Sequence, residues 1–156
     1  MIGAGGAARA VVHALIKAGL SKITIANRTQ ERADSLAGLF GPKVSAHRLD
    51  TFPQLARHAN LIINTTSLGM DGQSGEVLSL DEASSDALVT DIVYVPLETP
   101  FLAAARLRGL KTIDGLGMLL HQAVPGFERW FGVRPQVDPP LRAHLLAILD
   151  HRSRQP

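Results

Sequence analysis

The sequence contains no cysteine, few aromatic residues and no long uninterrupted apolar run. Without cysteine the chain cannot form disulfides, thiolate metal sites or a cysteine nucleophile, which is compatible with a reducing cytoplasm. No stretch approaches the roughly 18 apolar residues of a membrane span, and the first residues lack the basic segment of a signal peptide. We therefore expect a cytoplasmic protein without membrane contact.

Strong charge of one sign is also lacking. The 16 basic and 14 acidic residues leave a net charge of only +2, so nothing favours a nucleic-acid surface. The six histidines are scattered without metal-ligand spacing, and we expect no metal site. At 156 residues and 46% hydrophobic content, the chain has the size and composition of one ordinary domain with a substantial core.

A glycine-rich stretch near the start is the main functional motif. Residues 3–8 read G-x-G-x-x-A and lead into the apolar, helix-favouring residues 10–16. The first glycine would allow a tight strand-to-helix turn, and the second would let backbone approach a pyrophosphate. The small third position would let the helix pack closely on a sheet, with the phosphates at the helix N-terminus. Similar turns occur in methyltransferases, flavoproteins and structural loops, so this pattern alone leaves the ligand open.

The residues after the next strand distinguish between dinucleotides. An NAD site usually has an acidic residue there, roughly 20 residues after the glycines. Here the chain reads Asn27-Arg28-Thr29, with Arg32 one helical turn later. Arg28, which has no carboxylate beside it, suits the 2′-phosphate of NADP, and Arg32 could bind the same group. The alternative is two solvated arginines at a helix start, but positive charge there opposes the helix dipole, so the pattern favours a bound anion.

The rest of the chain alternates between strand and helix patterns and predicts an α/β, Rossmann-like, doubly wound, mainly parallel sheet flanked by helices. Only Met1 and Ile2 precede Gly3. The central first strand should therefore be truncated, leaving a slot and an open sheet prone to self-association. Strands are expected at 22–26, 43–48, 61–63, 87–93 and 111–113. Helices are expected at 10–16, 29–40, 50–58, 99–107, from 115 with an interruption or kink at Pro125-Gly126, and from 138. Thr99 is expected to be the N-cap of the helix over 99–107, with Pro100 at its first position. Residues 71–86 are expected to form a surface loop.

A polar segment, Asn64-Thr65-Thr66-Ser67, follows the strongly apolar strand at 61–63. Open α/β sheets bind ligands at the carboxyl ends of their strands, so this segment is expected to line a dinucleotide. The alternative is an ordinary hydrophilic loop.

Taken together and in order, these motifs resemble those of the C-terminal, NADP-binding half of shikimate dehydrogenases, including quinate/shikimate dehydrogenase relatives. The similarity covers nearly all 156 residues. The motifs are the glycine turn at 3–10, Asn27-Arg28-Thr29 with Arg32, residues 63–70, Asp91-Ile-Val-Tyr94 before Pro96 and Thr99-Pro100, and residues 114–123.

The resemblance implies one domain over residues 1–156, in which helices from about 115 onward close the cleft toward a missing substrate domain. It also implies which residues bind ligands. Tyr94 and Gln122 would reach the substrate, whereas the residues alone would make Met118 and Tyr94 core or rim residues. The implied NADP-binding residues are Gly3, Ala4, Gly5, Gly6 and Ala7 at the pyrophosphate, Asn27, Arg28, Thr29 and Arg32 at the 2′-phosphate, Thr66, Ser67 and Ile92 along the dinucleotide, and Gly115 and Met118 at the nicotinamide.

The family's reaction is the reversible reduction of 3-dehydroshikimate to shikimate by hydride transfer from NADPH. The resemblance places its proton-transfer residues in the N-terminal lobe, so we assign no catalytic residue here and expect this chain alone to be inactive. Two alternatives remain: a quinate dehydrogenase lobe, and a free-standing module that senses NADP(H). A methyltransferase is a third reading, but it would normally have an acidic residue near Arg28.

Overall fold

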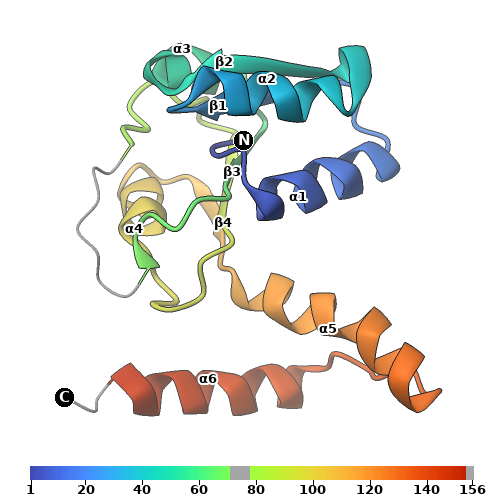
Figure 1. The fold of residues 1–156 in the computed structure, drawn as a ribbon. Coiled ribbons are helices and arrows are strands. Elements are labelled where there is room, and N and C mark those ends of the chain that lie inside the picture. The colour runs from blue at the N-terminus through green and yellow to red at the C-terminus, as the bar shows by residue number, and fades with distance from the viewer. Residues whose placement is uncertain (71–77, 154–156) are drawn as a thin grey trace.

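The computed structural model describes residues 1–70 and 78–153. They form an α/β fold in which parallel strands are flanked by helices, as predicted (Figure 1). The elements are α1 (Gly6–Lys17), β1 (Ile23–Asn27), α2 (Gln30–Gly38), η1 (Gly41–Lys43), β2 (Val44–Arg48), η2 (Leu49–Thr51), α3 (Phe52–Ala56), β3 (Leu61–Asn64), β4 (Leu88–Asp91), α4 (Pro100–Leu107), β5 (Lys111–Ile113), α5 (Leu116–Phe131) and α6 (Pro139–Ser153).

Residues 1–3 hold the sheet together at its centre. The pair β1–β2 and the group β3–β4–β5 are separate parallel ladders, and Ile2 forms a parallel bridge to Ala26 of β1 and to Asn64 of β3. Backbone bonds run from Ile2 N to Ile63 O (2.8 Å) and from Gly3 N to Ala26 O (2.9 Å). The order across the sheet is therefore β2, β1, residues 1–3, β3, β4, β5. From residues 1–3 at the centre, the chain first forms β1 and β2 on one side and then β3, β4 and β5 on the other.

The strand expected before Gly3 is thus seen as a bridge at Ile2 and not as a full strand. Met1 O accepts from Ala26 N at 2.8 Å, and Ile2 O accepts from Thr65 N at 2.9 Å, so residues 1 and 2 pair on both sides. Ile2 is almost fully buried, because it lies between two apolar strands. Self-association through an open sheet stays a prediction.

Short apolar strands account for the core. Ile25, Ile62 and Val89 are almost completely buried, as expected for parallel strands covered on both faces. Packing against them gives two clusters: Ala8, Val12 and Ala33 join the first around β1 and β2, and Phe52, Phe101 and Leu102 join the second around β3 and β4. The buried residues of the helices recur three or four positions apart, as Ala8 and Val12 do on α1, so they face the sheet together.

Several predicted boundaries were wrong. The strand expected over 87–93 covers only Leu88–Asp91, because the Asp91 side chain accepts a hydrogen bond from Val93 N and turns the chain. Residues 71–77 of the expected surface loop lie outside the described residues. The remainder is partly core, since Leu80 and Ala83 are 2% and 6% exposed.

Of the interruption or kink expected at Pro125-Gly126, the interruption is absent, because α5 continues to Phe131. The helix ends at Gly132 in the left-handed conformation (φ 69°). A proline removes one helical hydrogen bond, and here Pro125 and the residue four positions earlier, His121, are both exposed, so the freed carbonyl can meet water.

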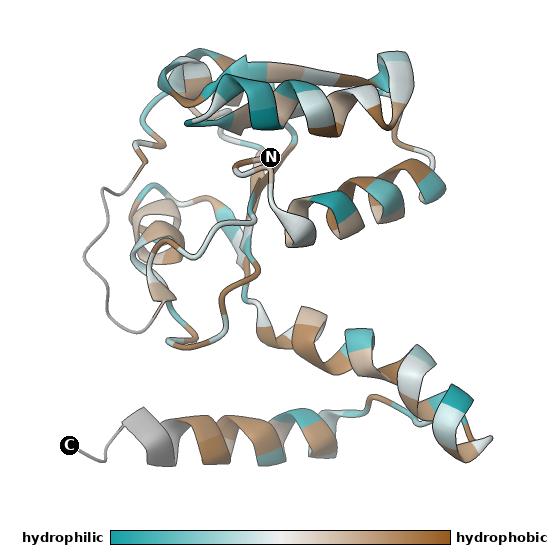
Figure 2. Cartoon of the chain, in the orientation of Figure 1, coloured by the Kyte–Doolittle hydropathy of each residue, from teal (hydrophilic) through white to brown (hydrophobic). Residues whose placement is uncertain are grey.

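The C-terminal helices extend away from the sheet (Figure 1). Figure 2 shows apolar stretches along both α5 and α6. Several large apolar side chains there are exposed, including Trp130 at 80% and Phe131 at 64%. Within the described ranges, no helix combines the length and apolarity needed to cross a membrane.

Candidate functional site

The candidate site lies at the edge of the sheet where β1, β3 and β4 end. Gly3 is at its centre, because residues 1–3 are paired with β1 on one side and β3 on the other. In open parallel sheets this switch in strand order is where ligands bind, since loops on either side diverge and leave a crevice.

Gly3 is required by its surroundings. Its φ is +101°, and a Cβ at this position would lie 2.8 Å from Thr65 Oγ1 and 2.9 Å from Thr66 Cγ2. The Thr65 hydroxyl is held there, because it donates to Ile2 O at 2.6 Å. The glycine turn and the segment after β3 are therefore in direct contact, as the predicted site requires.

The first turn of α1 is open to a ligand. Gly5 is the N-cap, no side chain caps the helix, and no acidic residue occupies the first turn. Gly5, Gly6 and Ala7 are exposed, and a Cβ at Gly5 or Gly6 would meet no atom within 4 Å. Amides in a first helical turn lack intrahelical partners, so they are available to an anion. Ala8, the small position of the motif, is fully buried against the sheet, as predicted.

The residues after β1 lie beside this turn, because Gly3 N donates to Ala26 O at 2.9 Å. Asn27 shapes the loop by donating from Nδ2 to Thr29 O at 2.8 Å. Arg28 and Arg32 are both exposed, and neither forms an ion pair with any of the residues described here. Both guanidinium groups are thus free to bind an anion.

Three buried polar side chains connect the ends of β3 and β4 with the start of α4. We call Asn64, Asp91 and Thr99 the polar junction; they are 3%, 0% and 0% exposed. Asp91 Oδ2 accepts from Asn64 Nδ2 at 3.0 Å and from Thr99 Oγ1 at 2.8 Å. Because buried polar groups are costly without partners, these bonds hold the three segments in one arrangement.

Burial raises the pKa of Asp91, while hydrogen bonds from Asn64, the Val93 amide and Thr99 oppose this shift. Desolvation disfavours the charged carboxylate and donated hydrogen bonds favour it. The Asp91 carboxyl group is buried, and the donors of its hydrogen bonds are all groups of the protein itself. Its role is therefore structural.

The opposite wall of the site is formed by the loop after β4 and the start of α5. A Cβ at Gly115 would lie 2.4 Å from Val93 O and 2.6 Å from Ile92 O, so the two segments touch through backbone. Ile92, Tyr94 and Met118 are half-buried and Gln122 is exposed. Among the described residues, no hydrogen bond joins Tyr94 or Gln122 to another predicted site residue.

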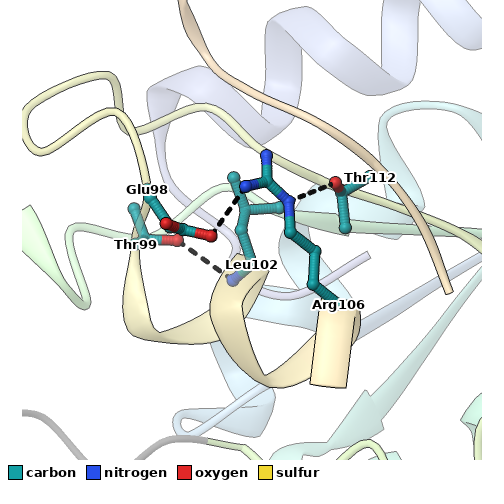
Figure 3. A network of polar contacts seen from close by, with 5 residues as sticks. All are labelled: Glu98, Thr99, Leu102, Arg106 and Thr112. Atoms are coloured by element: carbon teal, nitrogen blue, oxygen red, sulfur yellow. Dashed lines mark hydrogen bonds and ion pairs between the residues drawn. The ribbon is translucent and has the colours of Figure 1, made fainter. Parts of the chain in front are cut away.

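The end of the β4–α4 loop is fixed by a second network (Figure 3). Arg106 on α4 donates from Nη1 to Glu98 Oε1 at 2.7 Å and from Nε to Thr112 Oγ1 at 3.1 Å. Thr99, the predicted N-cap of α4, accepts from Leu102 N at 3.3 Å, which confirms the cap. The loop that carries Ile92 and Tyr94 is therefore anchored where it enters α4.

Sequence reasoning did not identify the polar junction. The sequence shows a polar residue at the end of each of two apolar strands and a threonine at the start of the following helix. Nothing in the sequence indicates that these three side chains meet. No group of three or more acidic or histidine side chains in the described ranges could hold a metal ion.

Comparison with known proteins gives a consistent result. The profile of the shikimate/quinate 5-dehydrogenase family matches residues 1–94, and that of the shikimate 5′-dehydrogenase C-terminal domain matches residues 115–139. A shikimate dehydrogenase (NADP(+)) of Brucella abortus is 57% identical over 94% of this chain and 52% of its own length. The corresponding protein of Mesorhizobium japonicum is 59% identical over 96% and 53%.

Solved structures with this fold include a quinate dehydrogenase from Corynebacterium glutamicum in complex with NAD, with a TM-score of 0.84, 33% identity and coverage of 94% of this chain and 53% of that one. A shikimate 5-dehydrogenase from Thermus thermophilus in complex with NADP(H) and shikimate has a TM-score of 0.74, 39% identity and coverage of 86% and 49%. This chain spans about half the length of the curated relatives it matches. The chain belongs to the shikimate/quinate 5-dehydrogenase family.

Proposed function

We propose that residues 1–156 form the NADP-binding domain of a shikimate dehydrogenase. The observation that carries this proposal is the position of the Gly3 turn, with the uncapped first turn of α1 on one side and the unpaired Arg28 and Arg32 beside it. A helix N-terminus next to two free guanidinium groups suits a pyrophosphate and a 2′-phosphate on one molecule.

Each group of residues has a proposed role. Amides of Gly3, Ala4, Gly5, Gly6 and Ala7 would bind the pyrophosphate, and Asn27, Arg28, Thr29 and Arg32 would surround the 2′-phosphate. Thr66, Ser67 and Ile92 would line the dinucleotide between its two halves. Gly115 would lie at the nicotinamide amide and Met118 against its ring. Support comes from the direct contacts of Gly3 with Thr66 and of Gly115 with Ile92.

Shikimate or 3-dehydroshikimate would meet the nicotinamide at the wall that carries Tyr94 and Gln122. Bound NADPH would supply the hydride that reduces the carbonyl group. The residues of this chain would bind and orient the cofactor, and the helices from about residue 115 onward would close the cleft toward a substrate domain. We assign proton transfer to that second domain, so this chain alone should show no shikimate oxidation above background, and adding the N-terminal half of a relative should restore it.

A second candidate is a quinate dehydrogenase domain that uses NAD, favoured by the similarity to the Corynebacterium glutamicum enzyme solved with NAD. The residues after β1 favour NADP, because Asn27-Arg28-Thr29 offers no carboxylate for a 2′-hydroxyl. A module that senses NADP(H) without catalysis would share this cofactor site but would have no need of Tyr94 and Gln122.

Titration of the chain with NADP and with NAD tests the cofactor preference. We expect NADP to bind more tightly, and Arg28→Ala to weaken NADP by about 10- to 100-fold, since a charge-assisted hydrogen bond contributes about 1.5–3 kcal/mol. NAD affinity should change little. Arg129→Ala, which removes an exposed arginine from the far end of α5, is the matched control and should alter neither ligand. Equal affinities for NADP and NAD in the unaltered chain would contradict the proposal.

A further inference from the structure

The polar junction consists of polar side chains in a part of the core where apolar side chains would be expected. Asn64, Asp91 and Thr99 are buried in a region otherwise filled by apolar side chains. Apolar residues of similar volume would avoid the cost of desolvating a carboxyl group, so stability alone does not explain the set. Directional hydrogen bonds fix geometry in a way that apolar contacts do not.

Asn64 and Asp91 each accept hydrogen bonds from a segment of the candidate site. Asn64 Oδ1 accepts from Thr66 N at 3.1 Å and from Thr66 Oγ1 at 2.7 Å, and Thr66 Oγ1 in turn accepts from Leu68 N at 3.2 Å. These bonds determine the direction of the chain after β3. On the other strand, Asp91 Oδ1 accepts from Val93 N at 3.0 Å, which determines the direction of the chain after β4.

The Thr99 hydroxyl closes the far end of that second loop. It donates to Asp91 Oδ2 at 2.8 Å and accepts from Leu102 N at 3.3 Å. The start and the end of the loop are therefore bonded to the same carboxylate. The loop between these points carries Ile92 and Tyr94. A single carboxylate therefore holds both ends of one loop and, through Asn64, the start of the other.

Among the residues that the structure describes, no hydrogen bond or ion pair joins the arginines after β1 to this junction. Arg28 and Arg32 lie on the other side of residues 1–3, which separate β1 from β3 in the sheet. The loop after β1 has its own internal bond, from Asn27 to Thr29. The two halves of the site are thus braced independently.

From these contacts we propose that the polar junction is a positioning device for one half of the cofactor. It holds Thr66-Ser67 and Ile92–Tyr94 at the separation that the nicotinamide half of NADP needs, and it has no part in binding the adenosine 2′-phosphate half. Asn64, Asp91 and Thr99 are positioning residues that act through the loops. This inference rests on the proposed function and deepens it.

The test compares two ligands on the same chain: NADP, and adenosine 2′,5′-bisphosphate, which carries the 2′-phosphate but lacks the nicotinamide half. Thr99→Val keeps the side-chain shape and removes both hydroxyl bonds. We expect it to weaken NADP by about 10-fold or more, the usual effect of losing one to two buried hydrogen bonds, and to leave bisphosphate affinity within about twofold. Thr99→Ser, which retains the hydroxyl, should restore NADP affinity to within about threefold of the unaltered chain.

Controls separate positioning from stability. Thr24→Val removes a threonine hydroxyl that accepts from Ser45 Oγ between β1 and β2, away from the junction and from the β4–α4 loop, and it should change neither affinity. Titrations are made well below each variant's melting temperature. If Thr99→Val does not fold, Asp91→Asn is used, because an amide presents one acceptor oxygen where the carboxylate presents two, and the same split between ligands is expected.

Equal weakening of both ligands, no change in either, or failure of Thr99→Ser to recover NADP binding would overturn the inference while leaving the proposed function intact. An unaltered chain that binds neither ligand would overturn the proposed function as well.

Discussion

Arg142 on α6 donates from Nη2 to Asp114 Oδ2 at 2.6 Å, although the two residues are 28 positions apart. The other carboxylate oxygen of Asp114 accepts from Leu116 N at 3.1 Å, at the first residue of α5. The Asp114 side chain is therefore bonded both to the start of α5 and to α6. Because Gly115 follows Asp114 directly, this contact also fixes the wall of the site that Gly115 contributes.

The ion pair between Arg142 and Asp114 should stabilise the C-terminal part of the fold. Their side chains are 37% and 20% exposed, so solvent screens the pair only in part. We expect Arg142→Ala to lower the free energy of unfolding by about 1 kcal/mol, and Asp114→Ala to lower it by more because the hydrogen bond from Leu116 N is lost too. Arg134→Ala breaks the more exposed pair with Glu128 and should cost less. Equal effects of Arg142→Ala and Arg134→Ala in denaturant titrations would contradict this expectation.

The two glycines at the turn should respond differently to alanine. Gly3→Ala places a Cβ against Thr65 and Thr66 at a φ of +101°, and we expect a loss of about 2–5 kcal/mol from backbone strain and overpacking together. Gly5→Ala adds a methyl group where no protein atom lies within 4 Å, so stability should change by less than about 1 kcal/mol. Its NADP affinity should fall instead, because the methyl group would occupy space next to the pyrophosphate. Thermal melts and NADP titrations of both variants separate the two effects.

A second pair of glycines tests the contact between the β4 loop and α5. Gly115→Ala would bring a Cβ within 2.4 Å of the Val93 carbonyl oxygen, so the start of α5 must move away from the loop. We expect destabilisation of about 2–4 kcal/mol, at the upper end for overpacking because the neighbour is backbone. Gly117→Ala lies in the first turn of the same helix with no neighbour within 4 Å, and it should be neutral or stabilising by up to about 1 kcal/mol. Similar melting temperatures for the two variants would show that the β4 loop and the start of α5 can move apart at little cost in stability.

The amino group of Met1 should make the stability of this chain depend on pH. It donates to Thr24 O at 2.7 Å, and burial lowers its pKa from 8.0 to about 6. Between these values the unfolded chain binds a proton that the folded chain does not, so stability is highest above pH 8 and falls as the pH drops toward 6. The loss should be on the order of 2–3 kcal/mol.

N-terminal acetylation removes the titrating amine and provides the comparison for this prediction. All other groups are the same in the two forms, so only the difference between the two stability curves reports on the Met1 amine. Denaturant titrations at pH 6, 7 and 8 measure that difference. Parallel curves would show that the amine is solvated in the folded chain.

The local features of this protein could be predicted from the sequence because they depend on short spacing. The glycine turn, the arginines after β1 and the threonine cap of α4 each involve residues within a few positions of one another. Apolar runs between turns likewise predicted the strands and their parallel order. In these cases the physical requirement, such as a positive φ at Gly3 or a hydroxyl at Thr99, is satisfied within one loop or by its neighbouring strand.

The tertiary structure decided which distant residues meet. Asp91 bonds to Asn64 across 27 positions and Arg142 to Asp114 across 28, and neither spacing follows from helix or strand periodicity. The same is true of Leu80 and Ala83, which are buried because the folded sheet offers them a surface, and of α5, which passes Pro125 because solvent can satisfy the freed carbonyl. A sequence states which groups need a partner, whereas the packing of the sheet determines which partner lies within reach.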